Sequence, residues 1–165
     1  MPAAVMKQAR NFILNAMILF ILSLGSGCSD PNGVLDHSTT IPNRNWGYVN
    51  DIKEHVTITD NSVPYNFYFN VRVTGDYKYS NMFVLLHTTG PGMKPHVMRY
   101  ELKLADVTGK WLGSGTGGVY AYQIPFKQGF RFPTKGTYNF LIEQNMRDNP
   151  LHEVSDIGLR VEKAK

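Results

Sequence analysis

Residues 67–73 read FYFNVRV, with a large apolar side chain at every second position. Successive side chains of a β-strand point to opposite faces of the sheet, so this alternation predicts a strand with one face in a core. The same period of two returns at 56–59, 98–104, 138–143 and 157–161, and the apolar runs 79–88 and 119–126 also read as strands. Pro125 indicates that the 119–126 strand lies at a sheet edge or ends there.

Clusters of Gly, Pro, Asn and Asp separate these runs, and no segment keeps a 3.6-residue apolar repeat over three turns. The pattern predicts an all-β fold: a single β-sandwich domain of about seven or eight strands, immunoglobulin-like or jelly-roll. We expect this domain over residues 46–165. Residues 28–45 contain mainly small and polar side chains with few large apolar groups, which predicts a flexible tether.

The first 27 residues have the composition of a cleaved secretory signal. Lys7 and Arg10 give a positive start, residues 12–24 are almost wholly apolar, and residues 25–27 are small. The apolar run is too short to span a bilayer as a helix, which needs roughly 20 residues. Cys28, the only cysteine, follows directly and predicts a lipoprotein acylated at that residue. The alternative is an ordinary signal peptide with an incidental Cys28, which would leave an unpaired thiol in a secreted chain.

Charge and cysteine content argue against a nucleic-acid partner and against disulfide bonds. Cleavage after residue 27 would leave 138 residues with 15 basic and 13 acidic side chains, a nearly balanced surface. No run of Lys and Arg marks a nucleic-acid footprint, so we expect no nucleic-acid partner. With Cys28 carrying lipid, no disulfide can form within the chain, and stability has to come from a packed core.

Residue types that carry catalysis or bind metals show no convincing arrangement. The five histidines are scattered; His87 and His96 flank one Gly/Pro turn, but two ligands make a poor zinc site. Residues 113–118 read GSGTGG without the Lys-Ser/Thr of a phosphate-binding loop, and we interpret them as a tight turn. We therefore expect no catalytic residue, no metal and no cofactor beyond the covalent lipid, and no enzymatic activity. A hydrolase built on the sandwich is the weakest alternative.

Aromatic residues are numerous for a domain of this size. Most should fill the two inner faces, where aromatic side chains suit β-structure. Trp111, Tyr77 and Tyr79 lie near predicted turns and are the best candidates for an exposed binding surface. They support an alternative function, a surface glycan-binding lipoprotein.

Eight short segments stand out for their order along the chain. They are PYN (64–66), YSNMF (79–83), AD (105–106), GKWLGSG (109–115), FRFP (130–133), GTY (136–138), IEQNMR (142–147) and DIGLRVEK (156–163). In this order they resemble the GldH-type gliding-motility lipoproteins of the Bacteroidetes. The resemblance runs from Trp46 to Lys163, and each segment is weak alone but the ordered set is specific.

This resemblance implies a lipid-anchored cell-envelope protein, on the outer membrane, that works with the gliding machinery and the secretion system linked to it. It implies envelope protein partners and supplies no catalytic residues, so only the lipid-bearing Cys28 is carried over. Family members also occur in species that do not glide, and an envelope-assembly or secretion role is the broader expectation.

Overall fold

The structure, a computed structural model, describes residues 30–164, and its compact unit begins at Asn32. Among these residues the helical content is one short 3-10 turn, η2 (Pro42–Arg44), and no helix is long and apolar enough to cross a bilayer. The strands are β1 (Gly33–Thr40), β2 (Asn45–Trp46), β3 (Ile52–Ile58), β4 (Tyr65–Thr74), β5 (Asn81–Thr89), β6 (His96–Lys103), β7 (Ser114–Thr116), β8 (Val119–Phe130), β9 (Gly136–Gln144), β10 (Leu151–His152) and β11 (Val154–Lys163).

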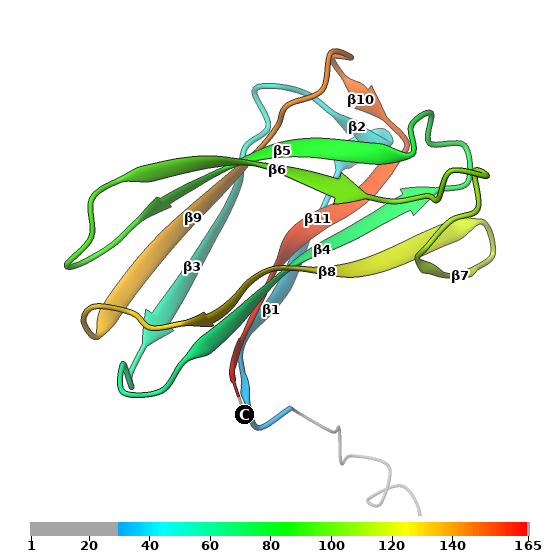
Figure 1. Ribbon diagram of the computed structural model, residues 1–165. Coiled ribbons are helices and arrows are strands. Elements are labelled where there is room, and N and C mark those ends of the chain that lie inside the picture. The colour runs from blue at the N-terminus through cyan, green and yellow to red at the C-terminus, as the bar shows by residue number, and fades with distance from the viewer. Residues whose placement is uncertain (1–29, 165) are drawn as a thin grey trace, which may run out of the picture. The chain divides into compact units, whose positions relative to one another are not determined.

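The strands form two packed antiparallel sheets, visible as two layers in Figure 1. One sheet has the order β1-β11-β4-β8-β7 and the other β3-β9-β5-β6, while the short β10 and β2 pair separately. If the three shortest strands are set aside and the remaining eight are numbered along the chain, the sheets read 1-8-3-6 and 2-7-4-5. That order is a jelly roll, which decides between the two predicted sandwich types.

The predicted all-β sandwich is confirmed, and each of the seven strand runs identified in the sequence lies in a strand. β4 shows why the period-two signal was reliable: residues Tyr65, Phe67, Phe69, Val71 and Val73 are each 3% exposed or less. Burying one such large apolar side chain contributes roughly 1.5–3 kcal/mol. The inner faces of the two sheets therefore hold the fold together.

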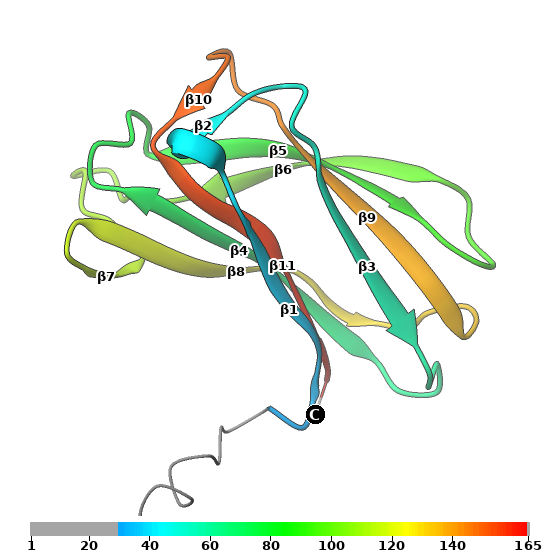
Figure 2. The same ribbon diagram turned by 180° about the vertical axis from the view of Figure 1, so that it is seen from behind.

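The flexible tether predicted for residues 28–45 is wrong over most of its length. Gly33–Thr40 forms β1, which pairs antiparallel with β11 along its whole length. Figure 2 shows β1 running beside β11, as the edge strand of the sheet. The amino-acid composition gave no sign of this strand because only Val34 and Leu35 of β1 pack against the core. As an edge strand, β1 is stabilised mainly by its backbone hydrogen bonds to β11. The domain thus starts well before the expected residue 46.

Gly158 on β11 is the feature that lets β1 approach. A Cβ at this position would overlap the His37 carbonyl oxygen and lie 2.6 Å from the Ser38 Cα. No side chain can be accommodated there while the two strands stay paired. The pairing of β1 with β11 therefore requires a glycine at position 158.

We expect Gly158→Ala to lower the free energy of unfolding by about 1–3 kcal/mol, because the added methyl group must push β1 away from β11. Urea denaturation measures the loss, and faster amide exchange in residues 33–40 locates it. Gly47→Ala is the matched control, since its nearest atoms lie at 3.6 Å and it should change stability little. Equal stability of the two variants, with β1 amides still protected, would contradict this role of Gly158.

Candidate functional site

The two sheets meet along two lateral borders, and one of them is closed. At that border the edge strands β1 and β3 are linked by His37 Nδ1, which lies 2.8 Å from Glu54 Oε1. Glu54 occupies an inner-face position of β3 and is 5% exposed, so this hydrogen bond satisfies a buried carboxylate. The contact joins one sheet to the other and seals this side of the sandwich.

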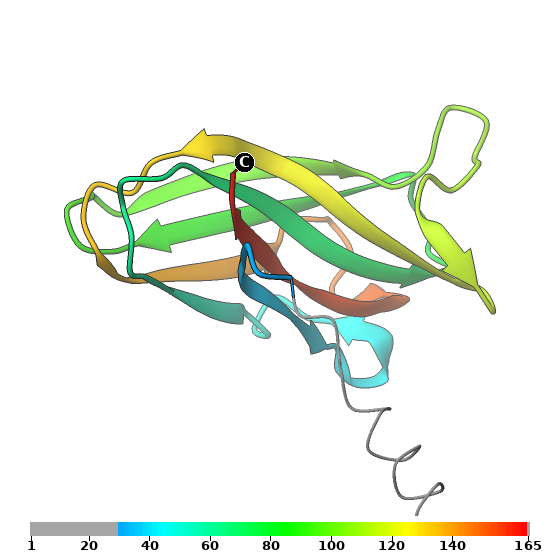
Figure 3. The ribbon, with the colours of Figure 1, turned by 90° about the horizontal axis from the view of Figure 1, so that it is seen from below.

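The opposite border, between β6 and β8, is open. β6 is the last strand of its sheet, and β7 covers only Val119, Tyr120 and Ala121 of β8. The rest of β8 is a sheet edge, which confirms the prediction made from Pro125. Figure 3 shows how the segment that joins β6 to β8 passes beyond the ends of the sheets instead of covering the gap between the two strands.

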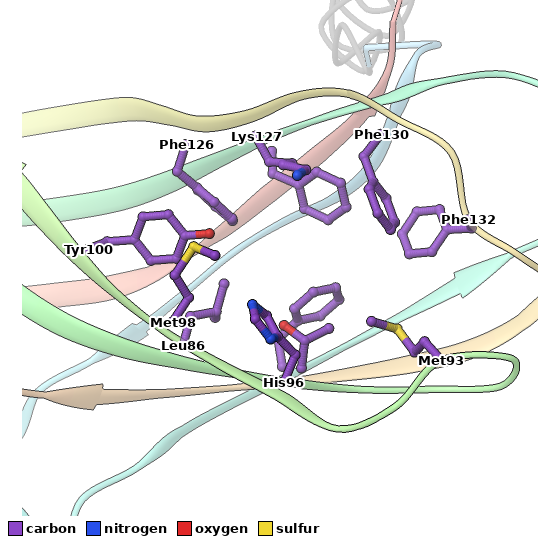
Figure 4. Close-up of a pocket in the computed structure, with 12 residues that line it drawn as sticks. Leu86, Met93, His96, Met98, Tyr100, Phe126, Lys127, Phe130 and Phe132 are labelled. Carbon is purple, nitrogen blue, oxygen red and sulfur yellow. The ribbon is translucent and has the colours of Figure 1, made fainter.

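A cleft of about 110 Å³ opens at this border. β6 and the turn before it line one wall, and β8 and the segment after it line the other, as Figure 4 shows. The side chains that face one another are chiefly Met93, Met98 and Tyr100 on one side and Phe126, Phe130 and Phe132 on the other. The lining is almost wholly apolar.

The inner face of β6 becomes more exposed toward the β5–β6 turn, and the cleft lies at this exposed end. Along the inner face of β6, Leu102 is 1% exposed, Tyr100 is partly buried and Met98 is 42% exposed. Met98 is thus an apolar side chain on the inner face of β6, and no other element of the described chain covers it. Methionine suits such a place because its flexible thioether adapts to differently shaped partners.

The base of the cleft is an aromatic cluster that holds its shape. The Phe126 ring lies 4.2 Å from the Phe69 ring and 5.0 Å from the Tyr100 ring, and Phe67 contacts Phe126, Phe130 and others at 5.7–5.9 Å. Such pairs contribute roughly 0.5–1.5 kcal/mol each beyond the area they bury. Burial raises the pKa of the Tyr100 hydroxyl, as expected beside an apolar surface.

The rim of the cleft carries positive charge. Lys127 and His96 are among the lining residues, and the exposed Lys94 stands between Met93 and His96 in the chain. The Lys127 ammonium lies 5.7 Å from the centre of the Phe130 ring. Within residues 30–164, neither lysine forms an ion pair with a carboxylate. The site therefore combines an apolar floor with an unneutralised basic rim.

Two of the aromatic residues proposed as a binding surface, Tyr77 and Tyr79, make structural contacts within the domain. Tyr77 is 4% exposed, its hydroxyl donates to the Asn81 carbonyl at 3.1 Å, and burial raises the pKa of that hydroxyl. The prediction that Tyr77 is available to a ligand is wrong. Tyr79 is partly buried, packs edge-on against Tyr77, and donates from its hydroxyl to Asp148 at 2.8 Å.

Trp111 is also partly buried. It stacks on Tyr120 at 5.3 Å and forms an isolated β-bridge with Ala105. The adjacent Leu112 is 55% exposed. The structure thus brings Tyr77 and Tyr79 together, and it pairs Trp111 with Tyr120.

The histidines flanking the β5–β6 turn lie on opposite faces of their sheet. His96 is in register with Thr88, with which it lines the cleft, whereas His87 faces outward with its Nε2 3.1 Å from Glu143 Oε1. They cannot share a ligand across the hairpin. In the described part of the chain, no cluster of three His, Cys, Asp or Glu side chains could hold a metal ion. Cys28 lies outside the described residues.

Sequence reasoning missed the cleft. Met98, Tyr100 and Phe126 lie in runs that were read as strands, and Pro125 marked β8 as an edge, whereas Met93, Phe130 and Phe132 lie outside those runs. The missing information was that β6 is an edge too, and that these two edges face each other across the sandwich.

Comparison with known proteins identifies close likeness to one family. A family model described as GldH lipoprotein matches residues 33–161, beginning at the first residue of β1. A relative named gliding motility lipoprotein GldH homolog, from Christiangramia forsetii, is 28% identical over 155 residues, which is 90% of this chain and 94% of that protein. Gliding motility lipoprotein GldH from Flavobacterium johnsoniae is 23% identical over 157 residues, 91% of this chain and 97% of that protein. No solved structure matches.

The contacts of Asp148 predict a pH effect. Hydrogen bonds from Tyr79 and Lys78 favour the charged carboxylate and lower its pKa from the ordinary 3.8. The stabilisation should be complete above the ordinary pKa and be lost as the pH falls through the lowered value. An NMR titration of the Asp148 carboxyl carbon should show a midpoint below 3.8 that rises in Tyr79→Phe.

Asp106 is the internal control, because its carboxylate accepts from Thr108 and should titrate identically in both proteins. An unchanged Asp148 midpoint in Tyr79→Phe would show that the Tyr79 hydroxyl has no structural role at this carboxylate.

Proposed function

The chain belongs to the GldH lipoprotein family, and on this basis we propose that it is a non-enzymatic, lipid-anchored interaction module in an envelope complex. The complex would serve gliding motility or the secretion linked to it. Relatives that match nearly the whole chain are named gliding motility lipoproteins, which supports a lipoprotein of this class.

The observation that carries the proposal is the open border of the sandwich. A jelly roll can close both borders, and this one closes only the border between β1 and β3. The other presents an apolar, aromatic surface backed by a tightly packed core. Exposed apolar surface of this kind is costly in water and is typical of a site that contacts another molecule.

We propose Cys28 as the lipid-bearing residue that holds the domain at the membrane. One acyl chain gives only marginal membrane binding, whereas two or three give stable anchoring. Because the compact unit begins at Asn32, the chain between Cys28 and the unit can reach at most about 14 Å. The proposed attachment is therefore short, in place of the long stalk expected from composition, and it would keep the domain close to the membrane surface.

Replacing the lipid-bearing thiol tests the anchor. Cys28→Ala should leave the protein unprocessed or release it in soluble form, because no thioether can form with the diacylglycerol. Fractionation of cells with and without the substitution measures the change, and mass spectrometry of the wild-type amino terminus should find the acyl chains. A Cys28→Ala protein that fractionates with the membrane and functions like the wild type would contradict the anchor.

The envelope role has its own test. Gentle crosslinking in native membranes, followed by pull-down, should recover defined envelope proteins with the wild-type chain. The same treatment of Cys28→Ala should recover much less of them, because the domain is no longer held at the membrane. Equal recovery of the same proteins from both would show that the anchor does not bring the domain to its complex.

A further inference from the structure

We propose that the cleft between β6 and β8 binds an extended segment of a partner protein, which adds to the free edge of β6 as a further strand. One large apolar side chain of that segment would enter the cleft beside Met98 and Phe130, with an acidic residue next to Lys127. This inference rests on the interaction role proposed above and names its contact surface and the chemistry of the partner.

The backbone of β6 can accept another strand. β6 has eight residues, none of them proline, and pairs with β5 along one edge only. An added strand would lie about 4.8 Å from β6 and continue the sheet over the open border. This mode of recognition uses main-chain hydrogen bonds for affinity and side-chain pockets for specificity.

β8 is the poorer edge for such pairing. Pro125 has no N–H to donate, and the β4–β8 register shifts near Phe67. Gly129 also has a left-handed φ of 65° that interrupts regular extended geometry. β8 therefore supplies side chains to the cleft, and β6 supplies the hydrogen bonds.

The size of the cleft selects a side chain as its occupant. An apolar cavity of about 150 Å³ admits a molecule the size of benzene. Sites that enclose drug-sized ligands are about 300–1,000 Å³. At about 110 Å³, the cleft fits a leucine or methionine side chain and is too small to enclose a fatty acyl chain.

The charge of the rim selects an acidic partner. Lys94 and Lys127 are unpaired within the described residues, and His96 adds positive charge when protonated. Carboxylates beside the apolar side chain would complement these groups and speed association. A second copy of this chain would instead present another β6 strand, whose basic residues Arg99 and Lys103 outnumber its one carboxylate, Glu101, so it would complement the basic rim poorly.

The test uses the full chain in lipid nanodiscs and a synthetic peptide of eight residues, the length of β6. In the peptide, leucine at the central cleft-facing position is flanked by glutamate at the neighbouring cleft-facing positions, two residues away on either side, and threonine fills the outward-facing positions. We expect the ε-methyl NMR signals of Met93 and Met98 to shift on titration, with half-saturation below about 1 mM. The signal of Met82, which is fully buried, should stay in place. Alternate amide protons of β6 should become protected from exchange.

Met98→Glu and Val97→Glu form the decisive pair. Both residues are exposed, at 42% and 51%, so both substitutions should be tolerated by the fold. Met98 is in register with Leu86, which lines the cleft, and Val97 with the outward-facing His87. Met98→Glu should weaken binding by about tenfold or more, because it places a carboxylate in the apolar floor. Val97→Glu should bind within about twofold of the wild type, and Lys127→Gln should bind about two- to fivefold more weakly.

The peptide is varied as well. N-methylation of alternate amides on the edge that faces β6 should abolish binding, and replacement of glutamate by lysine should weaken it. Unshifted Met98 methyl signals at about 1 mM peptide, full binding by the N-methylated peptide, or equal affinity of the two glutamate variants would each overturn the proposal.

Displacement of the peptide by palmitate at equimolar concentration would overturn the proposed strand addition and indicate a lipid site. A dimer that forms without peptide and is joined through β6 would overturn it too and indicate self-association. If the peptide fails while Cys28→Ala still loses the membrane and its crosslinked partners, the envelope role stands and only the contact surface is wrong.

Discussion

Each sheet of this sandwich has one apolar face, and the structure depends on the burial of those two faces against each other. The alternating residues of β4 are almost fully buried, β11 continues this face within the same sheet, and β3, β5 and β9 supply the facing residues from the other sheet. Once the faces are packed, the remaining freedom lies at the borders, where an edge strand of one sheet stands beside an edge strand of the other. Whether a border is closed or open then decides which inner-face residues are exposed to other molecules.

One border of the sandwich is closed and the other is open. β1 meets β3 through His37 and Glu54, so a buried carboxylate is satisfied by a side chain of the opposite sheet. Between β6 and β8 the Tyr100 and Phe126 rings are in contact, but inner-face residues nearer the β5–β6 turn, such as Met98, are left exposed. Soluble proteins generally protect sheet edges because free edges pair with other chains. β6 carries charges on its outer face but keeps an apolar inner face, so non-specific association is discouraged while a matching strand is still admitted.

The abundance of aromatic residues is largely structural. Tyr138 donates from its hydroxyl to the Pro91 and Thr134 carbonyls, and Tyr122 donates to the Leu104 carbonyl, so each fastens a loop to the core. Around the β4–β5 turn, Tyr77 donates to the Asn81 carbonyl and Tyr79 to the Asp148 carboxylate. A tyrosine can fill an inner face with its ring and still satisfy a backbone carbonyl with its hydroxyl. This explains why aromatic content alone is a poor guide to a binding surface in this domain.

The sequence by itself determined the all-β class, the seven main strands, the edge character of β8 and the family resemblance. Period-two alternation and turn residues are local properties, and they can be read without knowing which strands are neighbours. The first strand, the jelly-roll order and the cleft were decided only by the tertiary structure. β1 is held by the backbone of β11, 116 positions away at the Thr40–Asp156 pair, and its own side chains give little sign of it. The cleft likewise exists because β6 and β8 end their sheets on the same side, and which strands become edges depends on pairing between segments far apart in the chain.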